Sequence, residues 1–342
     1  LESKEKKLLL FAVLWCLCLI CLSVFKSDNV LLSLESSLFY VRFIFFTVFI
    51  YIFVKENTLK YLIYIFFICY IILFIDSIYQ YIFHINLTGY PYDPNYKRIT
   101  SFFGYEQILG SYIARTFPLI IGIFIFFNKI NNRTSLFLIS LITISIILVV
   151  FSGERLATFY LIISIITFGI ISRGNKILSY YFLITFLSIV TLFFTYPSLF
   201  DRVVFETYYY ITSPDTIFFS PGHTMHYITA LEIFKDNIFF GIGPKLFREV
   251  CNYPEYSVFM GCSTHPHHII FQILTEIGIF GFIPILYLLY KIFYNYFVKL
   301  YLSIVGRLHF SNLYEIMLLI CIINHFNFLA PSGNFFNNIL NI

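Results

Sequence analysis

Runs of about twenty apolar residues recur along this chain and leave few folds open to it. The first, LLLFAVLWCLCLICLSVF, carries no charged side chain from residue 8 to residue 25. As an α-helix, a run of this length crosses the hydrocarbon core of a bilayer, whereas the strands of a transmembrane barrel show shorter, alternating segments. Charged residues make up only 12% of the chain, about half their share in soluble domains. We therefore predict an all-α fold, a polytopic transmembrane helical bundle.

We expect about nine membrane spans. Their ranges are 8–25, 37–54, 60–83, 107–127, 135–151, 156–172, 178–195, 268–298 and 312–330. The polar stretch 196–267 is too long for a plain connector and is expected to be partly structured. The predicted organisation is transmembrane helices in 1–195, a large loop in 196–267 and C-terminal transmembrane helices in 268–342. The first run is interpreted as a true span, because no small-residue cleavage site of a signal peptide follows it.

Lysine and arginine residues orient the predicted bundle. With about nine spans, the short basic loops all lie on one side, which the positive-inside rule makes cytoplasmic. Their basic residues are Lys4, Lys6, Lys7, Lys55, Lys60, Lys129, Arg133, Arg173, Lys176, Lys299 and Arg307. The 196–267 loop then faces outward. Within it, HYITALEIFK has apolar residues at helical spacing, and it predicts an amphipathic helix on or near the outer membrane surface.

Three arginines near the predicted outer boundary are candidates for an anion site. Arg155 lies in FSGERLATF, at the outer ends of the fifth and sixth spans; Arg115 lies inside an apolar run, and Arg98 just outside it. A guanidinium group binds phosphate in a planar, bidentate way and never loses its charge. Intramembrane cations usually face a bundle interior or a cavity. For Arg155 the alternative is a snorkelling side chain that only reaches the headgroups. Convergence of the three in space is a hypothesis.

The stretch CSTHPHHIIFQILTEIGIFGF places three histidines at the start of an apolar helix. One interpretation is structural, with Thr264 or His265 as the helix cap and Pro266 near the first turn. A metal site is an alternative, but the spacing of Cys and His matches no standard zinc pattern. A third interpretation is a general base, because a neutral imidazole near cationic arginine is ready to accept a proton from an attacking hydroxyl. The candidates are His267 and His268.

Other polar residues accompany these histidines. His223 and His226 open the predicted loop helix as further pocket residues or as exposed polar groups, and we favour the second for His226. Glu276 either orients the base or the acceptor, or is a buried, paired carboxylate. Cys251 and Cys262 flank a polar loop. They form a disulfide if that loop faces an oxidising compartment, and otherwise they are two free thiols.

Four motifs, in order, resemble the O-antigen ligase and polymerase family of membrane proteins. RITSFFGYEQILGSYIA resembles the family's early outer-loop segment, and FSGERLATF resembles its S-G-x-R stretch. ALEIFKDNIFFGIGPKLF resembles its loop segment that ends in a G-x-G turn. STHPHHIIFQILTEIGIFGF resembles its H-N-x-x-L-Q segment leading into E-x-G-x-x-G. The resemblance covers about residues 98 to 338.

The resemblance implies a glycosyltransferase of the bacterial inner membrane, with its active site facing the periplasm. Such an enzyme moves a glycan from undecaprenyl diphosphate to a hydroxyl group, inverting the anomeric carbon, without metal or cofactor. The acceptor is lipid A–core for a ligase and a second lipid-linked glycan for a polymerase; we take ligase-like transfer as the first hypothesis. The family's essential residues correspond to Arg155 and His267. The candidates for binding the diphosphate or glycan are Arg98, Arg115, His223, His268 and Glu276.

The chain departs from the family pattern at several points. The family usually has Asn after the essential histidine, and this chain has His268, so the base is either His267 or His268. The family's loop often carries an arginine where this chain has His223, which binds diphosphate only when protonated. The predicted spans number fewer than the family's usual dozen or so, and the sequence begins with Leu. We expect a sequence truncated at both ends, with a natural short version as the alternative.

A transporter or flippase of lipid-linked oligosaccharide is the alternative from another functional class. It also needs many spans and affinity for anions, but such sites lie near the membrane midplane on broken helices, in folds with internal repeats. The charged candidates here cluster at the outer edge instead. The net charge of +4 is too small for a nucleic-acid-binding surface. The expected partners are therefore a lipid-linked glycan, its acceptor and membrane lipids.

Overall fold

The fold of the described chain is helical throughout. The computed structural model describes residues 3–92, 98–195, 201–214, 216, 220–308, 312–326 and 331–336. In these ranges it contains helices, turns and one isolated antiparallel bridge, between Ile85 and Pro91. The predicted all-α fold is confirmed.

The predicted spans coincide with helices. These are α1 (Ser3–Phe25), α2 (Val30–Phe53), α3 (Glu56–Phe83), α4 (Leu109–Phe127), α5 (Asn132–Ser152), α6 (Arg155–Ser172), α7 (Lys176–Thr195), α12 (Ile269–Ile304) and α13 (Leu313–His325). Within the described ranges, six helices are long and apolar enough to cross a membrane, namely α1 to α5 and α12, and the apolar parts of α6, α7 and α13 are shorter. The chain is thus a multi-pass membrane protein. The end of the span predicted at 312–330 lies outside the described residues.

Shorter helices occupy the polar segments. They are η1 (Ser101–Phe103), η2 (Asp201–Phe205), α9 (Glu206–Thr212), α10 (Pro221–Asp236) and α11 (Phe247–Val250). The predicted loop helix HYITALEIFK lies within α10. Residues 196–200 and several positions between 215 and 219 of the predicted loop lie outside the described residues.

Helix ends follow local sequence signals. Asn131 caps α5 by accepting hydrogen bonds from the backbone N–H groups of Arg133 and Thr134, and Thr134 completes a capping box. Gly153 ends the same helix in the left-handed conformation, with φ of 61°. Ser220 caps α10 and Pro221 occupies its first turn, where a missing N–H costs little. These signals fix where α6 and α10 begin, and both helices carry candidate site residues.

The described chain forms two compact units. The first comprises Leu1–Lys55, Tyr209–Lys291 and Phe326–Ile342; the second comprises Glu56–Tyr208 and Ile292–His325. The candidate histidines between residues 223 and 268, Glu276 and the two loop cysteines belong to the first unit. The three candidate arginines belong to the second. The predicted division into 1–195, 196–267 and 268–342 concerns placement in a membrane and stays a prediction.

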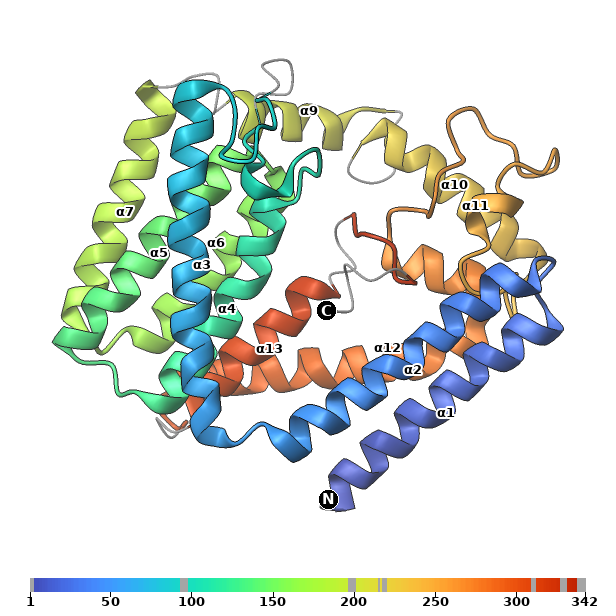
Figure 1. Cartoon of the computed structure of the whole chain (residues 1–342), viewed down its shortest axis with the longest axis horizontal. Helices are drawn as coiled ribbons and strands as arrows, with labels where there is room; N and C mark the ends of the chain where they lie inside the picture. The colour runs from blue at the N-terminus through green and yellow to red at the C-terminus, as the bar shows by residue number, and fades with distance from the viewer. Residues whose placement is uncertain are drawn as a thin grey trace. The chain divides into compact units, whose positions relative to one another are not determined.

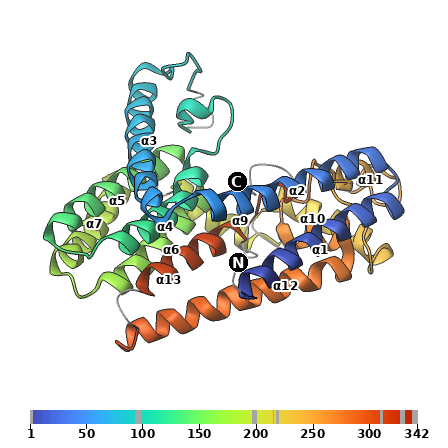
Figure 2. The same ribbon diagram turned by 60° about the horizontal axis from the view of Figure 1, so that its bottom comes forward.

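Helix α4 forms the centre of the second unit. It packs against α3, α5, α6 and α13, and α4 and α13 lie side by side in both views (Figures 1 and 2). Gly122 allows the close approach of α13, because a Cβ atom there would lie 2.9 Å from Cδ2 of Leu318. At one end of α5, the backbone N–H of Ile99 donates to Phe151 O at 3.1 Å. This hydrogen bond fixes the backbone next to Arg98.

The first unit is built around the N-terminal part of α12. Helices α1 and α2 lie side by side (Figure 1), and their buried residues Leu19 and Tyr40 pack in one cluster with Ile273 and Ile277 of α12. A second cluster joins Ile233 of α10 to the buried residues of α11. Phe271 of α12 packs against this second cluster, which therefore holds α10 and α11 against the start of α12.

A break in α12 anchors the polar segment that follows α10. Gly278 has φ of 64° and ψ of −172°, which interrupts the helical conformation. The freed backbone pairs with the segment that follows α10, since Ile279 N donates to Ile238 O at 2.9 Å and Gly243 N donates to Glu276 O at 2.8 Å. A Cβ atom at Gly278 would lie 2.4 Å from backbone atoms of Phe239. Only glycine fits this crossing.

Candidate functional site

Three imidazole rings gather around that of His267 in the first unit. The ring centroid of His267 lies 4.0 Å from that of His265, 5.2 Å from that of His226 and 5.6 Å from that of His223. His223 and His226 come from the first turns of α10, and the other two come from the segment before α12. We call these four residues the histidine cluster. His226, for which an exposed position was favoured, is one of its members.

The backbone of His267 is held in an uncommon conformation. Its φ is 56°, in the left-handed region that non-glycine residues seldom adopt. Its carbonyl oxygen accepts a hydrogen bond from the backbone N–H of Ser332 at 2.8 Å, and its Nε2 lies 3.1 Å from Ser263 Oγ. Backbone strain of this kind persists where the surroundings enforce it, and it recurs at functional sites.

Burial and crowding keep His265 and His267 uncharged. Burial, followed by the neighbouring histidines, lowers the pKa of His267 to about 3. Burial also lowers the pKa of His265 to about 4, although a hydrogen bond to Ser332 O opposes this. Both imidazoles are therefore neutral near pH 7 and able to accept a proton.

His268 occupies a different environment from His267. It is 4% exposed, and its ring lies 5.4 Å from that of Tyr227 and 4.8 Å from that of Phe271, measured between centroids. His267 is half-buried and faces other imidazoles. The sequence left the choice of base open between the two, and this geometry favours His267 because its ring is the more accessible.

Glu276 is fully buried and serves as an anchor for the loop. Its carboxylate accepts hydrogen bonds from the backbone N–H of Lys245 at 2.8 Å and of Phe247 at 3.2 Å. The side chain of Gln272 donates to it at 3.3 Å. These donors compensate a buried carboxylate. Of the two sequence interpretations, the structure shows the buried carboxylate, with backbone amides as its partners.

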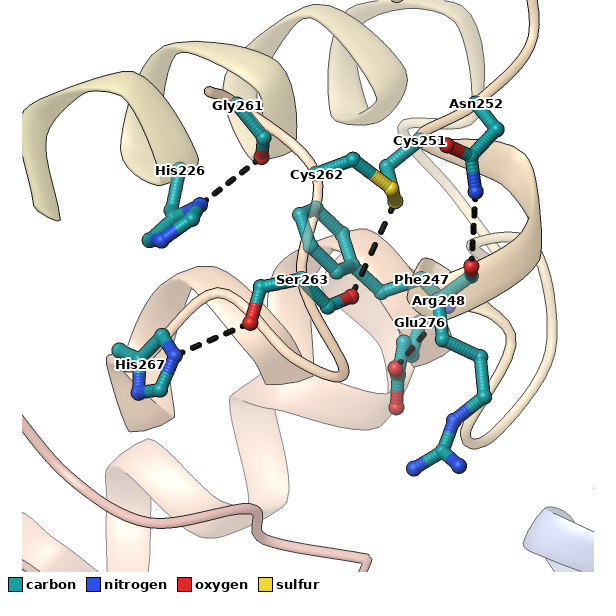
Figure 3. The surroundings of a disulfide bond; sticks show 10 residues. All are labelled: His226, Phe247, Arg248, Cys251, Asn252, Gly261, Cys262, Ser263, His267 and Glu276. Atoms are coloured by element: carbon teal, nitrogen blue, oxygen red, sulfur yellow. Dashed lines mark hydrogen bonds between the residues drawn. A yellow bond between two sulfur atoms is a disulfide. The ribbon is translucent and has the colours of Figure 1, made fainter. Parts of the chain in front are cut away.

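The structure joins Cys251 and Cys262 in a disulfide bond, with a Cα–Cα distance of 5.1 Å. Figure 3 shows the bond between the end of α11 and the segment that leads to His267. It closes the polar loop between the two cysteines, next to the histidine cluster.

The C-terminal segment Pro331–Phe336 contributes contacts that sequence reasoning missed. Asn334 accepts a hydrogen bond from Gln272 Nε2 at 2.7 Å, and Phe335 N donates to Gln272 Oε1 at 2.8 Å. Ser332 bonds both His265 and His267 through its backbone. The available signal was the group of small and polar residues in PSGN beside apolar helices. Its partner on α12 cannot be inferred from the sequence.

The three arginines approach the N-terminal part of α6 in the second unit. Arg155 forms an ion pair with Glu206 at 3.9 Å, and its side chain is 22% exposed. The guanidinium carbon of Arg115, on α4, lies 6.0 Å from the ring centroid of Tyr160, on α6. Arg98 donates a hydrogen bond to Gln107.

Glu154, which sequence reasoning did not select, links two of these arginines. It directly precedes Arg155 and accepts hydrogen bonds from Gly110 N at 2.7 Å and Ser111 N at 3.2 Å, at the start of α4. Burial raises the pKa of Glu154, while these hydrogen bonds and the charge of Arg98 act in the opposite direction. The carboxylate thereby ties the α5–α6 turn to α4 and to Arg98.

Among the described residues, no group of three or more His, Cys, Asp and Glu side chains is arranged to hold a metal ion. The histidine cluster brings rings together, but hydrogen bonds to protein oxygens engage one nitrogen each of His223, His226 and His267. The chemistry that this geometry supports is acceptance of a proton at a half-buried, neutral imidazole.

Comparison with known proteins adds a family assignment. A family model described as O-antigen ligase matches residues 138–286. The chain carries an O-antigen ligase family domain. Neither the curated proteins nor the solved structures gave a match.

The O-antigen ligase match includes most of the candidate site. Arg155, the histidine cluster, Glu276 and the disulfide fall within 138–286, whereas Arg98 and Arg115 precede that range. The match supports a glycosyltransferase-type enzyme of the ligase or polymerase kind, a class whose substrates are lipid-linked glycans. The predicted resemblance to this family is confirmed.

Proposed function

We propose that this protein transfers a glycan from undecaprenyl diphosphate to an acceptor hydroxyl on the periplasmic face of the bacterial inner membrane, as an O-antigen ligase with lipid A–core as acceptor. The observation that carries the proposal is the environment of His267. Its imidazole is neutral, half-buried and held in a strained backbone conformation within the matched range. A disulfide beside it supports an oxidising compartment on that side of the membrane.

His267 serves as the general base in this proposal. It takes the proton of the acceptor hydroxyl while the hydroxyl oxygen bonds to the anomeric carbon of the donor sugar. The bond from that carbon to the diphosphate oxygen breaks, and undecaprenyl diphosphate leaves with the electron pair. Direct displacement inverts the anomeric carbon. An imidazole with pKa of about 3 is a weak base, and a diphosphate anion near it raises that pKa and strengthens it.

The arginines bind the donor diphosphate in this proposal. Arg155 holds it and stabilises the charge that builds on the leaving group, and Arg98 and Arg115 assist. The ion pair of Arg155 with Glu206 is long and more than half exposed on the glutamate side, so a diphosphate can replace the carboxylate as partner. His223 and His268 line the acceptor or glycan side, and no metal takes part in the chemistry.

Reconstitution tests the proposal. The purified protein is placed in liposomes with undecaprenyl diphosphate-linked glycan, with or without lipid A–core, and the products are separated on a gel. We expect glycan on lipid A–core, loss of transfer with His267→Ala, and no effect of a chelator. His84→Gln, in the second unit and outside the histidine cluster, serves as the matched control.

Other outcomes of the same experiment identify other functions. A ladder of longer carrier-linked glycan that forms without lipid A–core indicates a polymerase. Movement of the glycolipid between leaflets without any transfer indicates a flippase and rejects the proposal. Loss of transfer on chelation rejects metal-independent chemistry.

A further inference from the structure

The two residues on either side of Cys262 each orient a histidine of the cluster. Gly261 O lies 3.0 Å from His226 Nδ1, and Ser263 Oγ lies 3.1 Å from His267 Nε2. Figure 3 shows both contacts as dashed lines beside the disulfide. The sulfur of Cys251 also lies 3.8 Å from Ser263 O. A displacement of Cys262 would therefore move both hydrogen-bond partners together.

The other end of the disulfide is firmly anchored. Cys251 is 1% exposed and packs with Phe247 and Val250 of α11. The N–H of Phe247 donates to the buried carboxylate of Glu276 on α12. Cys251 is thus fixed to the same helix that His267 precedes.

The segment 262–266 has few attachments of its own. Within the described part of the chain, no backbone–backbone hydrogen bond joins these five residues to another segment. Besides the contact with the Cys251 sulfur, its hydrogen bonds run to the C-terminal residues Ser332 and Asn334 and from Ser263 to His267. Apart from the peptide bonds at its two ends, the disulfide of Cys262 is therefore the strongest link between this segment and the rest of the first unit.

We propose that the Cys251–Cys262 disulfide and Ser263 are a positioning device for His267. The disulfide places Ser263 so that Oγ accepts the Nε2–H of His267, which leaves Nδ1 as the basic nitrogen. The hydrogen bond at one imidazole nitrogen sets which nitrogen carries the proton. Ser263 acts through His267 and does not touch substrate. This inference rests on the proposed function, in which His267 is the base.

Substitution of Ser263 tests the hydrogen bond. We expect Ser263→Ala to lower kcat about tenfold, with KM little changed, because small misplacements of a reacting group slow the chemical step strongly. Ser263→Thr keeps the hydroxyl and should restore most of the rate. The melting temperature of each variant is measured alongside. Equal kcat for Ser263→Ala and the wild-type protein overturns the role of Ser263, and so does a Thr variant as slow as the Ala variant.

Reduction tests the disulfide in the intact protein. Two thiols of dithiothreitol supply two electrons and two protons, so that the S–S bond breaks into two cysteine thiols and the reagent becomes its cyclic disulfide. We expect the transfer rate to fall about tenfold and to recover on reoxidation. The Cys251→Ser/Cys262→Ser variant should be slow already and insensitive to reductant. Cys21→Ser, at an exposed free cysteine of α1, is the matched control and should behave as wild type.

A readout that needs no enzymatic activity separates failure of this inference from failure of the proposed function. Diethyl pyrocarbonate modifies accessible neutral imidazoles, and mass spectrometry locates the modified residues. Reduction should change the modification rate of His267 several-fold and leave that of His84, which lies in the second unit, unaltered. An unchanged rate at His267 rejects the positioning device even if transfer is never detected. A changed rate without detectable transfer in the wild-type protein rejects the proposed function alone.

Discussion

The histidine cluster and the arginines are held in place in different ways. Around His267, hydrogen bonds come from residues distant in sequence, such as Ser332, and from loop residues tied by a disulfide. Arg155 and Arg115 project from regular helices, and a carboxylate one residue from Arg155 caps the neighbouring helix. Arg155 and Arg115 thus depend on helix packing, whereas His265 and His267 depend on cross-links between loops.

This difference indicates where each region is sensitive to change. A helix tolerates substitution of an exposed side chain, because its backbone hydrogen bonds remain. A loop held by a few specific bonds loses its geometry when one of them is removed, since buried polar networks act as a unit. Substitutions near the histidines should therefore alter the geometry, and substitutions at the arginines should alter mainly the charge.

The largest effect is expected for the base itself. His267→Gln should lower the transfer rate by about 10²-fold or more, because a positioned general base contributes about 10²–10⁴-fold. His268→Gln should have a small effect on kcat. The rates are measured in the reconstituted system. If the His268 variant is the slower of the two, the assignment of the base is reversed.

A somewhat smaller effect is expected when the positive charge of Arg155 is removed. Arg155→Gln should lower the rate about 10²-fold, because it removes a donor to the leaving group, with no change in melting temperature beyond that of a surface substitution. Arg133→Gln, at an exposed position in the first turn of α5, is the matched control. A large loss of stability in Arg155→Gln would show that the charge is structural and would remove the contrast drawn above.

Substitution of Gly278, where α12 crosses the backbone of Phe239, tests whether the loop geometry depends on α12. Gly278→Ala introduces a Cβ atom 2.4 Å from the backbone of Phe239 at a φ of 64°. The free energy of unfolding should fall by about 2–4 kcal/mol, as expected for backbone strain combined with a clash. Gly174→Ala, whose added Cβ atom would meet nothing within 4 Å, should change it little. The measurement is denaturation in detergent, and equal stability of the two variants would contradict the close crossing.

A gradual effect, rather than an abrupt loss, is expected for pH. The folded-state pKa of His267, about 3, lies below its ordinary value of 6.5. Between these values the unfolded chain binds more protons than the folded protein, so the free energy of unfolding should decrease as the pH falls from 6.5 toward 3. His267→Gln should lose part of this dependence. Melting temperatures between pH 4 and pH 7.5 provide the check, and identical slopes for both proteins would show that His267 is not buried as described.

Much of the fold followed from sequence patterns that are local. Apolar runs of span length predicted α1 to α7, α12 and α13, because a helix satisfies its own backbone in lipid. The periodicity in HYITALEIFK predicted α10. The break of α12 at Gly278 was not predicted, because it depends on the backbone of residues 238–243.

The candidate site was predicted only in part. The motifs selected Arg155 and His267, since charged and titratable side chains are rare in such a chain. They did not select Gln272 and Asn334, because an amide in an apolar segment has a use only once its partner is known. They also left His226 as an exposed group, although its ring lies beside His267.

The sequence by itself determined a helical membrane protein with the motifs of one enzyme family, because span length, caps and residue chemistry are properties of short segments. The tertiary structure decided which imidazole is accessible and which residues orient it. His223 and Ser332 meet His267 from separate parts of the chain, and Cys251 is bonded to Cys262 in the segment before it. Such contacts form only when packing brings distant segments together, and no local pattern encodes them.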